Sequence, residues 1–169
     1  MYLDSVLDAL SRAENENDLE QLRAELAEQG YLRLLRRKGK PPKSLPPMEY
    51  TASDGTRILV GRNNRQNDQL SLKTARRDDL WLHVQKFHGT HVIIACAGVQ
   101  PPDGTITEAA ELAAYYSEAR ESQNVPVDVT PVRCLRKPNG AKPGMVVYDR
   151  YRTVLVTPDA ALPARLRVE

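Results

Sequence analysis

The chain has 169 residues, of which 41% are hydrophobic and 27% charged, and its formal net charge is +2. This composition is close to that of an average globular protein, so it excludes disorder or a coiled coil along the whole length. No apolar run approaches the ~18 residues that a membrane span needs, and the N-terminus lacks the basic start and apolar core of a signal peptide. We therefore expect a cytoplasmic protein with no membrane partner.

Residues 1–35 predict a helical arm in two pieces. Leucine and valine recur at three- and four-residue spacing in two runs, Leu3-Val6-Leu7-Leu10 and Leu19-Leu22-Leu26. Asp18 is expected to cap the start of the second piece and Gly30 its end. The stripes are narrow, which favours a coiled-coil seam whose partner is absent. The alternative is a helical hairpin folded onto its own domain.

Charge is segregated between this arm and the segment that follows it. Residues 1–30 carry eight acidic and two basic side chains, whereas residues 31–47 carry six basic side chains and no acidic one. Prolines 41, 42, 46 and 47 exclude a helix, so residues 36–47 are expected to form a basic, proline-rich linker. Such a linker suits a position near a polyanion, and a solvated tether is the alternative.

Residues 48–159 predict one folded domain that begins with two β-hairpins. The first pairs residues 48–53 with 57–60 around the Asp54-Gly55 turn. The second pairs residues 79–85 with 90–97 around a short link. The second pair is apolar on both faces, so we expect it in the middle of the sheet, covered by helices.

The remaining elements complete an α+β fold. After the polar, turn-rich segment 61–68, a short helix is expected around Leu70, and a covering helix is expected to start at Thr105. Residues 127–135, 145–148 and 153–157 read as strands, and two prolines are expected to keep the tail, residues 160–169, irregular. The prediction is a mostly antiparallel sheet of about seven strands with two covering helices, preceded by a helical (coiled-coil) arm.

Metal and redox chemistry find little support in the sequence. His83 and His91 would lie opposite each other in the second hairpin and form a possible functional pair. No nearby carboxylate completes a ligand set, so we predict no metal and no cofactor, with a metal-dependent hydrolase as the alternative. Cys96 and Cys134 are expected to be buried, reduced thiols. The glycine-containing loop 140–144 lacks the pattern of a nucleotide-binding loop, so no small-molecule substrate is expected.

Basic and polar side chains on loops are the natural chemistry for phosphate groups. The candidate RNA-binding residues fall in three groups: Arg62, Asn63, Asn64, Arg65, Gln66 and Asn67 on one loop; Lys73, Arg76 and Arg77 on the next helix; and Arg136, Lys137 and Lys142, with Arg133, around a turn. A solvated charged face is the alternative for each group. The chain has one Trp and one Phe, which favours recognition of the RNA backbone and shape over stacking on bases.

An ordered series of motifs over residues 50–159 resembles the NFACT-R domain. The motifs are Tyr50 to Gly55, Ile58 to Asp68, Asp79 to Val84, Gly89 to Ile94, Glu108 to Ser117, Val125 to Arg133, Lys137 to Val146 and Val156 to Asp159. This domain is the C-terminal part of the bacterial RqcH family, relatives of eukaryotic NEMF that are also known as fibronectin-binding protein A homologues. The resemblance extends over about two thirds of the chain, which makes it more specific than any single motif.

The resemblance implies a non-enzymatic RNA-binding module in ribosome-associated quality control. The full-length family members bind an obstructed large ribosomal subunit, recruit charged tRNA and promote alanine tailing of the stalled chain. The implied partners are therefore the large ribosomal subunit, rRNA, tRNA, and the NFACT domain and coiled coil of the same full-length protein. We expect Arg62, Arg65, Arg76 and Lys142 to contribute most to RNA binding. The alternative is an adhesion module for fibronectin or fibrinogen, which the lack of an export signal disfavours.

Overall fold

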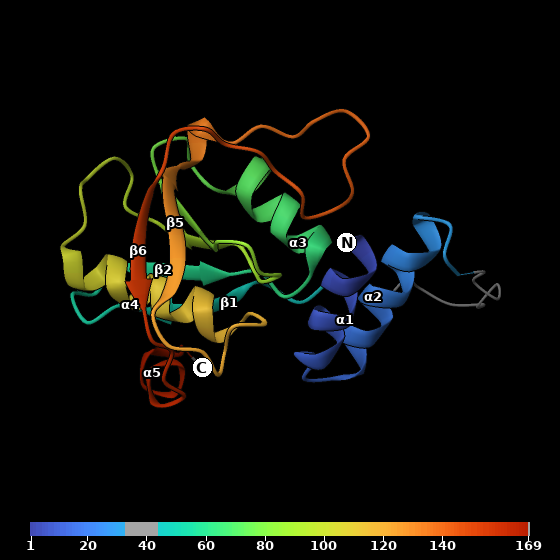
Figure 1. Ribbon diagram of the computed structural model, residues 1–169, viewed down its shortest axis with the longest axis horizontal. Helices are drawn as coiled ribbons and strands as arrows, with labels where there is room; N and C mark the ends of the chain where they lie inside the picture. The colour runs from blue at the N-terminus through green and yellow to red at the C-terminus, as the bar shows by residue number, and fades with distance from the viewer. Residues whose placement is uncertain (33–43, 169) are drawn as a thin grey trace.

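The computed structural model describes residues 1–32 and 44–168, and its centre is a six-stranded antiparallel sheet (Figure 1). The strands are β1 (Met48–Thr51), β2 (Arg57–Val60), β3 (Leu80–Val84), β4 (Val92–Ile94), β5 (Val125–Pro131) and β6 (Arg152–Val156). Their order across the sheet is β1-β2-β4-β3-β5-β6, and every pair is antiparallel. The predicted α+β class and antiparallel sheet are confirmed.

Both predicted hairpins are present. β1 pairs with β2 through a turn in which Gly55 has φ +91°, and the Asp54 carboxylate accepts the Thr56 backbone N–H at 3.0 Å. β3 pairs with β4 in the register Leu82 opposite Val92, and these two strands occupy the middle of the sheet as expected.

The sheet has six strands rather than about seven, because residues 145–148 do not join it. This segment forms only an isolated bridge between Val147 and Arg136. Val146 and Tyr148 instead pack over the cluster around Trp81 on one face of the sheet. Apolar contact with a sheet face has thus replaced backbone pairing at a sheet edge.

The two faces of the sheet bury two separate clusters, because side chains alternate along each strand. On the inner face, Ile58, Leu82 and Ile94 pack against α4 (Asp103–Tyr115), whose alanines permit close approach. On the outer face, Leu59, Trp81 and Ile93 pack against Leu70 and Val132. Helix α4 starts at Asp103, two residues before the predicted Thr105, and its N-cap is Pro102.

The other helices differ from the sequence prediction in two places. Residues predicted as a turn-rich loop form α3 (Asn64–Gln69), which continues into a π-helical turn, η1 (Leu70–Thr74). The tail contains α5 (Ala161–Leu166), although prolines were expected to keep it irregular. Pro163 lies in the first turn of α5, where a backbone N–H has no intrahelical acceptor and its loss carries no penalty. A short 3₁₀ turn, η2 (Val132–Cys134), follows β5.

The N-terminal arm forms a helical hairpin that lies against the domain. Helices α1 (Tyr2–Ser11) and α2 (Glu16–Glu28) pack on each other through Val6, Ala9 and Leu22, and α1 contacts α3 (Figure 1). Asn15, not Asp18, caps α2, and Gly30 with φ +81° ends it as predicted. The described part of the arm is therefore the hairpin alternative, and the linker 36–47 lies largely outside the described residues.

No helix among the described residues is long and apolar enough to span a membrane. Cys96 and Cys134 are free thiols, as expected, but they are half-buried rather than buried.

Gly61 provides a test of how closely β2 and α3 approach each other. An added Cβ would lie 1.9 Å from Oδ1 of Asn67, which is buried and cannot swing away. Gly61→Ala is therefore expected to lower the free energy of unfolding by about 2–3 kcal/mol, measured by urea denaturation.

Gly104→Ala is the matched control for that substitution. Gly104 lies in the first turn of α4, and its added Cβ would meet nothing within 4 Å. Because alanine favours helix, this variant is expected to be stabilised by up to about 1 kcal/mol. Equal stabilities for the two variants would contradict the close packing at Gly61.

Candidate nucleic-acid interface

The first predicted RNA-binding group, Arg62 to Asn67, lies at the start of α3 and faces the arm. Asn63 caps the helix, because its side-chain oxygen accepts the backbone N–H of Gln66 at 2.9 Å. This is the ordinary role of an asparagine in front of a helix. Because of this cap, the polar residues after Asn63, which were predicted to form a loop, form the first turn of α3.

Asn67 ties α3 to the sheet. Its side-chain Oδ1 accepts the Thr90 hydroxyl at 3.1 Å and the His91 backbone N–H at 3.3 Å, and only 1% of the residue is exposed. The Thr90 hydroxyl also lies 2.6 Å from the carbonyl oxygen of Gly61. Because these groups are buried, losing the Asn67 amide would leave unpaired polar atoms in the core.

Arg62 and Gln66 hold the chain that enters the domain. Oε1 of Gln66 accepts the Arg62 backbone N–H at 2.7 Å, and its Nε2 donates to the carbonyl of Leu45 at 2.7 Å. The Arg62 guanidinium donates to the carbonyl of Pro46 at 2.8 Å and lies 3.7 Å from the Glu14 carboxylate of the arm. Only 14% of the Arg62 side chain is exposed, so its guanidinium mainly contacts groups of the chain itself and not solvent.

Asn64 and Arg65 bind the second helix of the arm. Nδ2 of Asn64 donates to Oε1 of Glu25 at 3.2 Å and to Oγ of Ser5 at 3.1 Å, and Arg65 forms an ion pair with Glu28. Glu25 is fully buried and also accepts the Tyr2 hydroxyl at 2.6 Å. Burial raises the pKa of Glu25, because desolvation disfavours its charged form.

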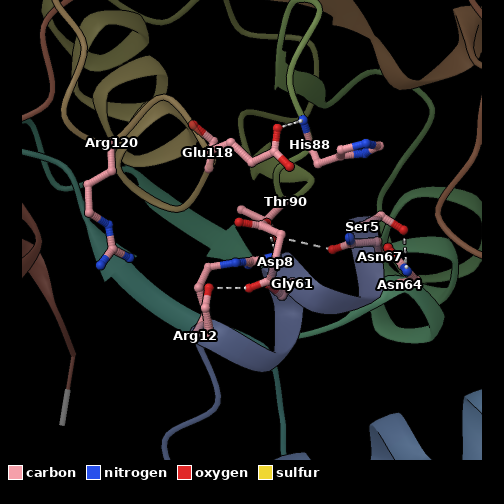
Figure 2. A network of polar contacts seen from close by, with 12 residues as sticks. Ser5, Asp8, Arg12, Gly61, Asn64, Asn67, His88, Thr90, Glu118 and Arg120 are labelled. Carbon is pink, nitrogen blue, oxygen red and sulfur yellow. Dashed lines mark hydrogen bonds and ion pairs between the residues drawn. The ribbon is translucent and has the colours of Figure 1, made fainter. Parts of the chain in front are cut away.

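A second buried polar contact lies at the end of α1, between Asp8 and the C-cap residue Arg12. Asp8 and Arg12 form an ion pair of 3.0 Å that is more than nine-tenths buried. Figure 2 shows this pair lying between the turn that carries Glu118 and Arg120 and the helix that carries Asn64 and Asn67. Burial lowers the pKa of Arg12 and raises that of Asp8, so each charge depends on the other.

The third predicted group is also partly engaged. Lys137 lies 3.0 Å from the Asp68 carboxylate and donates to the carbonyl of Lys142 at 2.6 Å. Lys142 donates to Oε1 of Gln29 at 3.2 Å and lies 5.5 Å from the ring centres of both Tyr2 and Tyr31. Arg136 is exposed and lies 3.9 Å from Asp149. The structure thus brings Lys142 to the arm and leaves Arg136 in solvent.

The exposed cations without an acidic partner in residues 1–32 and 44–168 include Lys73, Arg76, Arg77 and Arg133, which we call the outer basic patch. The backbone N–H of Arg133 donates to the carbonyl of Arg77 at 3.0 Å, so these two arginines are adjacent although distant in sequence. The sequence grouped Arg133 with the turn around Pro138, and only the fold joins it to Arg77.

The nearest buried carboxylate does not neutralise this patch. Asp79 is 4% exposed, and its two oxygens accept the backbone N–H groups of Arg76 at 2.8 Å and Ala97 at 2.9 Å. Its charge is thereby used to hold the turn before β3. The guanidinium groups of Arg76 and Arg77 remain exposed for an external anion.

The histidine pair lies where the sequence placed it, opposite each other on β3 and at the entry to β4. The ring centres of His83 and His91 are 5.7 Å apart. The Ser71 hydroxyl lies 2.7 Å from Nδ1 of His91, and the Gly144 carbonyl lies 2.9 Å from its Nε2. Burial and the neighbouring His83 lower the pKa of His91 to about 3, so it is neutral at physiological pH. Among the described residues, no group of three or more His, Cys, Asp or Glu side chains is placed to hold a metal.

A small aromatic cavity, which the sequence analysis missed, lies beside this pair on the outer face. Its volume is about 210 Å³, and its lining includes Trp81, His83, Lys86, Phe87 and Tyr148. A sequence signal for it exists in the four rings of Trp81, His83, Phe87 and His91, which fall within one short stretch of the chain and all line the cavity. Tyr148 comes from a distant part of the chain, so only the fold brings it to the other rings.

Comparison with known proteins agrees with this geometry. A sequence profile described as the NFACT protein RNA binding domain matches residues 47–149. The chain belongs to the NFACT RNA-binding domain family. The match covers the sheet strands β1 to β5, helices α3 and α4, and the residues of the outer basic patch.

Its relatives are longer proteins of one kind. The chain is 46% identical to "Rqc2 homolog RqcH" of Bacillus subtilis (strain 168) over 98% of this chain and 29% of that protein. It is 43% identical to the protein of the same name from Streptococcus pneumoniae serotype 2 over 99% of this chain and 30% of that protein. The chain therefore spans less than a third of the length of these curated relatives.

A solved structure has the same fold over the whole chain. It is the C-terminal part of the fibronectin/fibrinogen-binding protein from Streptococcus suis. The TM-score is 0.92 at 42% identity, covering 99% of this chain and 67% of that one. The likeness extends beyond the NFACT RNA-binding domain and includes the N-terminal arm.

The pH dependence of the free energy of unfolding tests whether Glu25 is buried between the arm and the domain. Its pKa is raised on folding, so the native state binds more protons than the unfolded state above the ordinary pKa of 4.5. Its contribution to stability is complete below that value and is lost as the pH rises through the folded pKa. Glu25→Gln is therefore expected to remove a decline in unfolding free energy that the wild type shows as the pH rises above the ordinary glutamate pKa of 4.5.

Glu28→Gln is the control for this pH series. Glu28 lies on the same helix but is exposed, with its side chain paired to Arg65. Its removal should change stability by at most about 0.5 kcal/mol at any pH. If both variants showed the wild-type pH profile, a buried Glu25 that resists ionisation would be ruled out.

Proposed function

We propose that this chain is a non-enzymatic, cytoplasmic RNA-binding module of a ribosome-associated quality control factor. As part of a longer protein, it would bind tRNA and the rRNA of obstructed large ribosomal subunits, and so support alanine tailing of stalled chains. The observation that carries the proposal is the outer basic patch, in a chain that belongs to an RNA-binding family.

The exposed positive charges of the outer basic patch support it as the surface that contacts RNA phosphates. Lys73, Arg76 and Arg77 are exposed, lie within five residues of the chain and have no described acidic partner. Arginine matches phosphate with two parallel hydrogen bonds, and release of counterions from the RNA adds to the affinity. Cations that already carry an internal partner, such as Arg62, would have to break that contact first.

The Arg62 to Asn67 segment has a different part in this proposal. Its side chains cap α3, bind the arm and hold the entry to β4. We propose that it sets the orientation of the arm relative to the outer basic patch. RNA contact by Arg62, Arg65 and Lys142 stays a prediction, and it would require their ion pairs or hydrogen bonds with the arm to open.

The salt dependence of RNA binding tests the patch. In the double variant Arg76→Gln/Arg77→Gln, the slope of the logarithm of the binding constant against that of salt should fall by about two. Binding to tRNA and to isolated large ribosomal subunits should weaken without dependence on RNA sequence, because phosphates carry no sequence information. Filter binding or anisotropy over a salt series measures both.

Arg57→Gln/Arg165→Gln is a control with the same loss of charge. Both arginines are exposed and each lies beside a glutamate, Glu49 and Glu108 respectively. This variant should keep the wild-type salt slope. If the control and the patch variant weakened RNA binding equally, the net charge of the chain, not the patch, would be responsible.

Adhesion is a second candidate, because the similar Streptococcus suis structure is described as part of a fibronectin/fibrinogen-binding protein. Under this reading the chain would bind immobilised fibronectin or fibrinogen directly. Recovery of the intact protein from the surface of unlysed cells, together with such binding, would favour adhesion. Binding only to RNA would favour the first proposal.

A further inference from the structure

The aromatic cavity on the outer face is not explained by contacts to a phosphate backbone. It lies between the turn that joins β3 and β4 and the segment that carries Val146 and Tyr148. We propose that it holds one unpaired nucleobase of a bound RNA. This inference rests on the proposed RNA binding and adds base recognition to it.

The lining has the character of a stacking site. Trp81 and His91 are buried at the bottom, where the indole and imidazole rings meet edge to face at 5.1 Å between centres. His83 lies parallel to Trp81 at 5.7 Å, and Tyr148 lies 4.9 Å from Trp81. Bases stack on such rings regardless of sequence, because every base has a π-face.

The exposure of the lining residues leaves the cavity open on one side. Phe87 is 40% exposed, Lys86 is exposed, and His83 and Tyr148 are half-buried. An exposed phenylalanine at the edge of a cavity is available to cover a ligand that enters it. A cation beside it is suited to the phosphate that accompanies a base.

Two further observations point to a ligand. Lys86 has φ +64°, a left-handed conformation that is rare for a residue other than glycine and that clusters at functional sites. The indole N–H of Trp81 is buried and has no hydrogen-bond acceptor. Such a donor is rare in a folded core without a role or a bound partner.

Size selects among possible occupants. Pockets for drug-sized molecules measure about 300–1,000 Å³, and this cavity is smaller. It therefore fits a single flat ring system, not a whole nucleotide cofactor. The sequence argued against base stacking because the chain has one Trp and one Phe, yet the fold brings both to this cavity.

Phe87→Ala tests the cavity, with a short single-stranded RNA, the same RNA without bases and the same sequence as a duplex as probes. The wild type should bind the single strand about tenfold more tightly than the abasic RNA, and Phe87→Ala should remove this advantage. Duplex binding and the salt slope should not change, because no phosphate contact is lost. The single strand should also alter the fluorescence of Trp81, the only tryptophan.

Val99→Ala is the control, since Val99 is 72% exposed on another loop and does not line the cavity. Unchanged urea midpoints for both variants would show that they fold. If Phe87→Ala bound the single strand as tightly as the wild type, the base site would be overturned while RNA binding through the outer basic patch stood. If the wild type bound none of the three RNAs, both proposals would be overturned.

Discussion

The buried carboxamide of Asn67 is the contact on which the arrangement of this molecule depends. One oxygen accepts hydrogen bonds from Thr90 and His91, and it lies so close to Gly61 that no side chain fits there. The contact fixes α3 against the ends of β2 and β4. Because α3 carries Asn64 and Arg65 toward the arm, the same contact also decides where α1 and α2 lie.

The polar residues on the two sides of this junction differ in what they contact. On one side, Asn64 of α3 donates hydrogen bonds to the arm, and burial makes each of these bonds costly to lose. On the other side, η1 and the turn before β3 leave Arg76 and Arg77 in solvent, and the buried Asp79 carboxylate of this turn accepts backbone N–H groups instead of pairing with them. The cations that contact the arm are therefore structural, and those on η1, the turn before β3 and η2 are free.

The aromatic cavity and the outer basic patch would divide RNA recognition between them. A phosphate contact gives affinity that depends on salt and not on sequence, whereas a stacked base requires an unpaired nucleotide. A module with both properties would prefer RNA that has exposed bases next to structured backbone. Loops and ends of folded RNA have this character, and regular duplexes do not.

Elements with a local signal could be predicted from the amino-acid sequence alone. The Asp54-Gly55 turn and the short link before residue 90 predicted both hairpins, apolarity on both faces predicted that Leu82 and Val92 lie mid-sheet, and Gly30 predicted the end of α2. The sequence could not decide which polar residues are free, since Arg62 and Arg76 look alike in the chain, yet only Arg62 meets the Pro46 carbonyl and the carboxylates of the arm. It also could not place residues 145–148, whose apolar side chains suit a strand and a covering segment equally. Those choices depend on contacts between residues far apart in the chain, and only the tertiary structure makes them.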